Sequence, residues 1–179
     1  LVVIQFNATV IIWSFFVIPL VVVYPLLKRI THFPQVVLGL AFNWGVIVGS
    51  LNQNENINYS IFYLYLAGVF LTIAYDTIYG FQDIDDDKDL GLRSLAILLE
   101  NKQIVIFYLY MISSLFFLTF FLINFNNKIA SLICGLVIFI IFFYQYFSFK
   151  KKKSLLKIFQ ANVLNGGIIS TLVLIQNYL

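Results

Sequence analysis

Charged residues are scarce in this 179-residue chain, where Asp, Glu, Lys and Arg make up 11% of the sequence and hydrophobic residues make up 61%. A soluble globular domain typically carries about 25% charged residues. A water-soluble fold of this length could not bury so much apolar surface. The composition therefore argues against a soluble domain and predicts an all-α, polytopic integral membrane helix bundle.

The chain also has a single cysteine, Cys134, and a single histidine, His32. One cysteine excludes a disulfide or a thiolate metal cluster within the chain, and we expect Cys134 to be a small apolar-facing residue. No second histidine is available to share a metal site, so we interpret His32 as a loop residue rather than a ligand.

The chain is instead rich in long apolar runs. A helix needs about 20 mostly apolar residues to cross a bilayer, and six stretches qualify, the second of them barely: residues 2–24, 36–51, 60–81, 104–123, 129–149 and 158–178. No internal repeat is convincing, so we expect residues 1–179 to form one transmembrane domain.

The basic residues orient these spans. Ten of the 11 lie in the connections 25–35, 82–103 and 150–157, and only Lys128 lies on the other side. Positive charges favour the cytoplasmic or matrix face, which predicts a bacterial or mitochondrial inner-membrane protein with its odd-numbered connections on that face. Because these charges do not follow one face of the chain, we expect no nucleic-acid binding.

Six of the eight carboxylates lie within residues 75–89. On one continuous helix, Asp83 and Asp87 are a turn apart, and Asp76 lies one heptad before Asp83 on the same face. Mg²⁺ is commonly held by one or two carboxylates together with substrate phosphates. The acidic segment therefore predicts a magnesium site for an anionic substrate.

The alternative is a solvated helix end or a calcium-like surface loop. Asp76 argues against a plain boundary, because a carboxylate inside a span costs roughly 2.5–3.5 kcal/mol. The calcium-loop pattern also fails, since Lys88 stands where the turn glycine belongs and the closing Glu is missing. We expect Asp85 and Asp86 only to solvate the helix end.

A second polar segment lies between Pro25 and Pro34 on the same side of the membrane. Arg29 offers a planar fork suited to a diphosphate or a carboxylate, and Lys28 offers a point charge. Both residues also fit the simpler role of membrane anchors.

Two aromatic residues flank Asp76. Tyr75 and Tyr79 are four residues apart and so share a helix face. Their rings could stabilise a carbocation, or they could simply pack near the membrane interface, and the sequence favours neither.

Two segments resemble a known family. YDTIYGFQDIDDDKDLGLRS (75–94) and YPLLKRITHFPQVVLGLAFNWG (24–45) resemble the second Asp-rich motif and the neighbouring basic loop and helix of the UbiA superfamily of membrane prenyltransferases, most closely its 4-hydroxybenzoate polyprenyltransferase branch. The resemblance implies helices around a central cavity in which two Asp-rich motifs hold Mg²⁺ on a prenyl diphosphate.

The implied activity is transfer of a polyprenyl group from polyprenyl diphosphate to 4-hydroxybenzoate in ubiquinone biosynthesis, within the lipid bilayer. By resemblance, Asp83 and Asp87 are the metal ligands and Arg29 binds the diphosphate or the aromatic acid. Asp76 is implied as an inner catalytic residue. The remaining substrate contacts that we expect are Lys28, Tyr75, Tyr79 and Asn43.

The first family motif, NDxxDxxxD, is absent from this sequence. We therefore expect the chain to be N-terminally incomplete, to supply six of nine family helices and to have little or no turnover as given. Alternatives are a prenyltransferase for another acceptor, such as haem or a naphthoate, and a non-catalytic membrane remnant. A transport subunit would carry charged or polar residues near the middle of several spans. Within the six predicted spans, Asp76 is the one acidic residue.

Overall fold

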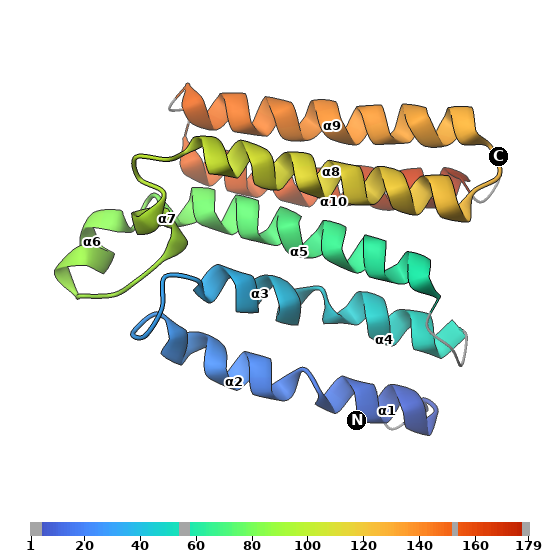
Figure 1. Ribbon diagram of the computed structural model, residues 1–179, viewed down its shortest axis with the longest axis horizontal. Helices are drawn as coiled ribbons and strands as arrows, with labels where there is room; N and C mark the ends of the chain where they lie inside the picture. The colour runs from blue at the N-terminus through green and yellow to red at the C-terminus, as the bar shows by residue number, and fades with distance from the viewer. Residues whose placement is uncertain (1–4, 54–57, 152–153, 177–179) are drawn as a thin grey trace.

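The computed structural model describes residues 5–53, 58–151 and 154–176, which form helices joined by short connections, with no strand in these ranges (Figure 1). The helices are α1 (Ala8–Phe15), α2 (Ile18–Leu27), α3 (Pro34–Phe42), α4 (Trp44–Gln53), α5 (Tyr59–Gly80), α6 (Ile84–Asp89), α7 (Leu95–Leu98), α8 (Ile104–Asn124), α9 (Lys128–Lys150) and α10 (Leu155–Gln176). The predicted all-α class is confirmed.

Six helical segments are long and apolar enough to cross a membrane, as predicted. They are Ala8–Leu27, Pro34–Asn52, Tyr59–Gly80, Ile104–Asn124, Lys128–Lys150 and Leu155–Ile175. The first two crossings are each built from two helices, α1 with α2 and α3 with α4. The first described crossing extends three residues beyond the predicted limit at position 24, and the predicted ends at positions 2 and 178 lie outside the described residues.

The break between α3 and α4 is held by Asn43. Its side-chain Nδ2 donates to the Gly39 carbonyl at 2.9 Å and to Thr72 Oγ1 of α5 at 2.9 Å. These bonds satisfy polar groups that hydrocarbon cannot solvate. The interruption is therefore tied directly to the neighbouring span.

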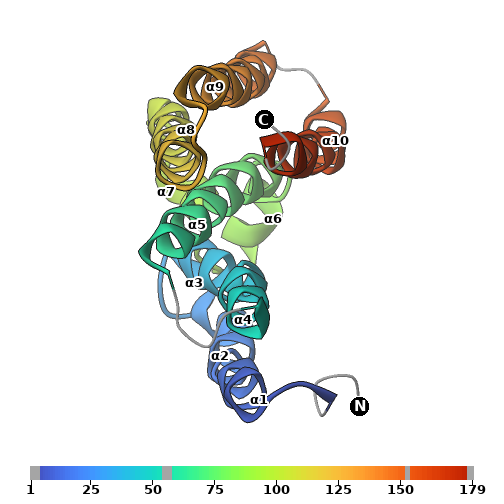
Figure 2. The ribbon, with the colours of Figure 1, turned by 90° about the vertical axis from the view of Figure 1, so that its right-hand side faces the viewer.

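Helix α5 is the centre of the bundle. It packs against α3, α4, α7, α8 and α10, and Figure 2 shows it between α1–α4 on one side and α8–α10 on the other. Hydrogen bonds reinforce the packing: Tyr65 Oη donates to the Leu40 carbonyl of α3 at 3.0 Å, and Ser113 Oγ of α8 donates to the Ala67 carbonyl at 2.7 Å. Hydroxyl groups commonly join helices in this way within membranes.

The outer surface is apolar along the length of the helices. Phe16 of the first crossing and Leu136 and Ile133 of α9 are each more than half exposed. Large exposed hydrophobic side chains of this kind need a partner other than water. Together with the six spans, they fit a chain embedded in lipid.

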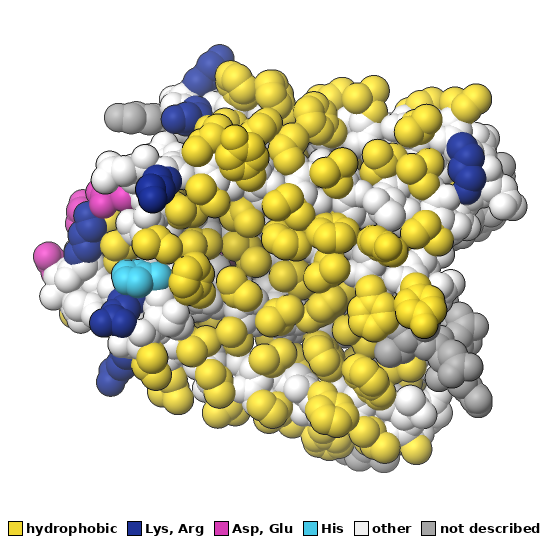
Figure 3. All heavy atoms as spheres, viewed as in Figure 1, with side chains coloured by type: hydrophobic (Ala, Val, Ile, Leu, Met, Phe, Trp, Pro, Cys, Tyr) yellow, Lys and Arg dark blue, Asp and Glu magenta, His cyan; other side chains and the backbone are white. Residues whose placement is uncertain are grey.

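Charged side chains gather at one end of the bundle (Figure 3). The α2–α3 connection, α6, α7 and the α9–α10 connection all lie at this end (Figure 1). A lone basic side chain is visible at the opposite end, on this face of the molecule. This arrangement agrees with the predicted grouping of the odd-numbered connections on one side of the membrane.

The tight contact between Gly135 of α9 and Leu118 of α8 predicts a steric requirement at Gly135. A Cβ added there would lie 2.7 Å from Leu118 Cδ1 and 3.2 Å from Leu118 Cβ, whereas Gly49 has open space. We expect Gly135→Val to lower the free energy of unfolding by about 1–3 kcal/mol through overpacking. Thermal unfolding in detergent, with Gly49→Val as the control, measures this. Equal effects of the two substitutions would contradict it.

Candidate functional site

Asp76 does not lie on one helix with Asp83 and Asp87, so the predicted shared helical face of the three carboxylates is wrong. Helix α5 ends at Gly80, residues 81–83 form a turn, and α6 begins at Ile84. Water replaces hydrocarbon at this point, so the backbone is no longer restricted to helix. Helix α7 also docks here, since a Cβ on Gly80 would lie 3.2 Å from Ala96 Cβ.

Asp83 and Asp87 are still one turn apart, because the Asp87 amide donates to the Asp83 carbonyl at 2.7 Å. Asp83 is the N-cap residue of α6, but its carboxylate makes no capping hydrogen bond. Asp83 is exposed, whereas Asp87 is 7% exposed. The pair thus joins one solvent-facing carboxylate to one that is nearly buried.

Gly91 ends α6 and reverses the chain. Its φ is +66°, a conformation that glycine adopts without steric cost. The Gly91 amide donates to the Lys88 carbonyl and the Leu92 amide to the Asp87 carbonyl, which is a Schellman motif. The turn directs Arg93, two residues after Gly91, back toward the α2–α3 connection.

Arg93 fastens the basic connection to the acidic one. Its amide donates to the Lys28 carbonyl at 2.7 Å, and its Nη1 donates to the Ile30 carbonyl at 2.7 Å. Nearby, the Leu95 amide donates to Oε1 of the buried Gln35 at 3.2 Å. Two segments more than 50 residues apart in sequence are therefore held as one unit.

A peripheral ion pair also ties α6 to the chain after α7. Lys88 Nζ donates to Glu100 Oε2 at 2.8 Å. This hydrogen bond raises the pKa of Lys88, so its ammonium group stays charged throughout the neutral range.

Lys28 lies between the two acidic elements. Its Nζ is 3.9 Å from Asp87 Oδ1, and it is close enough to Asp76 in α5 to interact with that carboxylate electrostatically. Asp76 also interacts with Tyr24 of α2. Arg29, which follows Lys28 in the sequence, is exposed at the same end of the bundle. The structure thus brings Lys28, Asp76 and Asp87 together, despite the break in the helix.

The two predicted tyrosines face α10. The rings of Tyr75 and Tyr79 pack against Phe159, with centroids 5.9 and 4.7 Å away. Asn43 lies deeper, because its partner Thr72 is one turn below Asp76 on α5. Asn43 also lines a cavity of about 530 Å³ between α4, α5 and α10. Within the described residues, these three side chains have evident packing or hydrogen-bonding roles.

Sequence reasoning gave no special role to Arg93, Gln35 or Gly91. Gly91 had a local signal, because a glycine directly after a short charged helix is a common C-terminal cap. Arg93 and Gln35 had none, since their partners lie about 60 residues away in sequence. Only tertiary structure reveals such pairs.

The donor set at this end fits a hard divalent cation. The described residues contain no group of three or more His, Cys, Asp and Glu side chains arranged around a metal. However, Mg²⁺ usually takes one or two carboxylates and completes its octahedron with water and phosphate oxygens. Asp83, with its carboxylate free of capping, and the adjacent Asp87 match that requirement.

A helical membrane bundle with paired carboxylates and cations at one end is the class of protein that these features define. Residues 1–164 match the UbiA prenyltransferase family. The chain belongs to this family, which confirms the resemblance in its sequence.

Similar proteins cover only part of the chain. It is 54% identical over 79 residues to the mitochondrial 4-hydroxybenzoate polyprenyltransferase of Aedes aegypti, covering 44% of this chain and 18% of that protein. It is 41% identical over 100 residues to the 4-hydroxybenzoate octaprenyltransferase of Pseudomonas fluorescens, covering 56% and 34%. The chain thus spans about a third or less of the length of these two relatives.

The fold has a counterpart among solved structures. The apo structure of a UbiA homologue from Aeropyrum pernix superposes with a TM-score of 0.82 at 17% identity, over 97% of this chain and 66% of that one. At this identity the likeness shows the fold alone.

The fastening by Arg93 leads to a measurable expectation. The amides of Arg29, Ile30 and Thr31 are hydrogen-bonded to Leu26 and Leu27. We expect Arg93→Met to speed their hydrogen exchange by about fivefold, since one lost hydrogen bond is worth about 1 kcal/mol. Lys102→Met, an exposed cation in the same connection, is the control. Unchanged exchange in Arg93→Met would show that the bond does not hold the connection.

Proposed function

We propose that this chain belongs to an enzyme that transfers a polyprenyl group from polyprenyl diphosphate to 4-hydroxybenzoate, with Mg²⁺ as cofactor, in ubiquinone biosynthesis. The observation that carries the proposal is the position of Lys28, 3.9 Å from Asp87 and within electrostatic range of Asp76. Cations and carboxylates at the end of an apolar bundle suit a substrate with a charged head and a long apolar tail.

Asp83 and Asp87 would hold Mg²⁺, which would neutralise charge on the diphosphate oxygens. Lys28 and Arg29 would bind the same diphosphate from the α2–α3 connection, Arg29 through its fork and Lys28 as a point charge. A separation of 3.9 Å between Lys28 and Asp87 is too long for a hydrogen bond. Both groups therefore retain capacity for a ligand.

The chemistry follows from this charge. When the bond between the prenyl carbon and the diphosphate oxygen breaks, its electron pair leaves with the diphosphate, and an allylic cation forms. The rings of Tyr75 and Tyr79 would stabilise that cation, and the apolar spans would exclude the water that destroys it. The ring carbon ortho to the phenol then attacks, and the ring loses a proton.

The names of the relatives support the acceptor. The proteins from Aedes aegypti and Pseudomonas fluorescens are named for 4-hydroxybenzoate. That support favours 4-hydroxybenzoate over haem or a naphthoate. The geometry of the charged end supports binding of the diphosphate and the metal.

The carboxylates of α6 provide a test with an internal control. The chain is assayed alone and joined to the upstream segment of the Pseudomonas relative, because it spans a third of that protein. In the active form, we expect Asp83→Asn and Asp87→Asn each to lower turnover by about 10²–10³-fold, a range typical for the loss of one electrostatic contact to a transition state. Asp85→Asn, an exposed residue of α6, is the matched control.

Equal effects of Asp87→Asn and Asp85→Asn on turnover would show that Asp87 is not part of the site. Prenylation of a different acceptor, such as a naphthoate, with no prenylation of 4-hydroxybenzoate, would overturn the proposed acceptor.

Metal removal tests the cofactor separately. We expect EDTA to abolish prenyl transfer and added Mg²⁺ to restore it, because two carboxylates and a diphosphate place several negative charges together. Product formation at several Mg²⁺ concentrations measures this. Undiminished turnover in EDTA would exclude the metal-dependent mechanism.

A further inference from the structure

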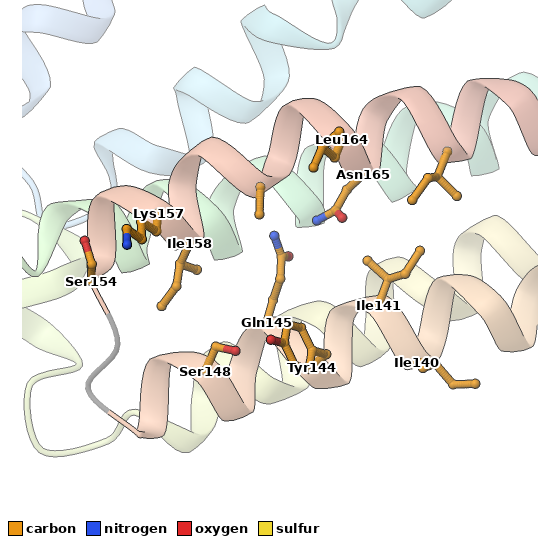
Figure 4. Close-up of a pocket in the computed structure, with 12 residues that line it drawn as sticks. Ile140, Ile141, Tyr144, Gln145, Ser148, Ser154, Lys157, Ile158, Leu164 and Asn165 are labelled. Atoms are coloured by element: carbon orange, nitrogen blue, oxygen red, sulfur yellow. The ribbon is translucent and has the colours of Figure 1, made fainter.

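A second cavity lies away from the charged end of α5 and α6, between α9 and α10. Its volume is about 770 Å³, and its lining is mostly apolar. Ile140 and Ile141 of α9 and Leu164 and Ile168 of α10 form its apolar walls. Figure 4 shows the cavity as a groove between the two helices, with polar side chains at its centre and at one end.

Two buried amides occupy the centre of this groove. Gln145 is 3% exposed and Asn165 is 8% exposed, and their side chains point toward one another from opposite helices (Figure 4). Gln145 Nε2 donates to Asn162 Oδ1 at 2.8 Å. Gln145 Oε1 and Asn165 Nδ2, however, are buried without a hydrogen-bond partner.

This pair has a specific chemical complement. One atom is a free acceptor and the other a free donor, so a single hydroxyl group could donate to Gln145 Oε1 and accept from Asn165 Nδ2. Leaving buried polar atoms unpaired is unfavourable, especially in a membrane. A hydroxyl-bearing ligand would satisfy both atoms at once.

The polar end of the groove is basic. Lys157, Ser154 and Ser148 line it, where α10 begins near the charged end of the bundle (Figure 1). Lys157 and Asn165 lie on one face of α10, about 12 Å apart along the axis at 1.5 Å per residue. Lys157 is exposed and forms no ion pair within the described ranges. This end favours an anionic group.

We propose that the α9–α10 groove binds the prenylated hydroxyaryl acid that the reaction produces, as it leaves for the bilayer. The inference rests on the proposed function. Lys157 pairs with the carboxylate, the phenol hydroxyl bridges Gln145 and Asn165, and the prenyl tail lies along the isoleucine and leucine walls. A diacyl phospholipid fits less well, because its ester carbonyls only accept hydrogen bonds and leave Gln145 Oε1 unpaired.

Binding to the chain in nanodiscs tests this proposal without turnover. The probe is ortho-geranyl 4-hydroxybenzoate, added in EDTA to nanodiscs with and without protein. Its phenol methyl ether, which cannot donate a hydrogen bond, is the comparison ligand. We expect the phenol to bind about tenfold more tightly than the ether, because the ether cannot donate the hydrogen bond to Gln145 Oε1.

Substitutions locate the site. We expect Gln145→Leu to remove the preference for the phenol over the ether, and Lys157→Gln to weaken both ligands by about tenfold. Gln160→Leu and Lys151→Gln change exposed residues of α10 and of the α9 end outside the groove, and both should bind as the unsubstituted chain does. Thermal unfolding of each variant reports on its folding.

Equal binding of the phenol and its ether would overturn the proposal, as would displacement of the phenol at equal concentration by phosphatidylcholine, which has no hydrogen-bond donor. The outcome is independent of catalysis. Prenyl transfer without product binding in the groove would refute the groove alone, whereas product binding without prenyl transfer in the extended chain would refute the proposed function.

Discussion

Burial of α5 among its neighbours is the interaction on which the other parts of the structure depend. The hydrophobic effect does not drive helix association inside a membrane, so close packing and interhelical hydrogen bonds must do so. Fully buried Ala67 and Ala74 let other helices approach α5 closely. The bond from Asn43 to Thr72 then ties the broken second crossing to the same helix. This packing fixes the positions of Asp76 and of the tyrosines beside it.

The charged end is a second assembly built on that framework. Helix α5 delivers the acidic segment to the membrane surface, Gly91 reverses it, and Arg93 fastens it to the carbonyls of Lys28 and Ile30. Lys28 is thereby held beside Asp87 at 3.9 Å. Hydrogen bonds from Arg93 to backbone carbonyls, rather than an ion pair of Lys28, hold Lys28 in this position. The charges are consequently left available for a ligand.

Much of this could be predicted from the sequence, because a bilayer imposes strong patterns on it. Span length, the grouping of basic residues and the acidic segment each have local signals, and all six spans are confirmed. The end of the third span near residue 81 was predicted, but Asp76 and Asp83 do not share one helical face, because the turn at residues 81–83 separates α5 from α6. The contacts of Arg93 were missed because they join segments far apart in sequence. Nothing local marked Gln145 and Asn165 as partners across a groove.

In the proposed mechanism, α6 and the α2–α3 connection form one site for a metal-bound diphosphate. Electron paramagnetic resonance of Mn²⁺, a substitute for Mg²⁺, tests it on the chain in nanodiscs with inorganic diphosphate. We expect Mn²⁺ to bind in the presence of diphosphate, and we expect that binding to be lost when Asp83 and Asp87 are both changed to Asn. Identical Mn²⁺ binding in that double variant and in the unsubstituted chain would contradict it.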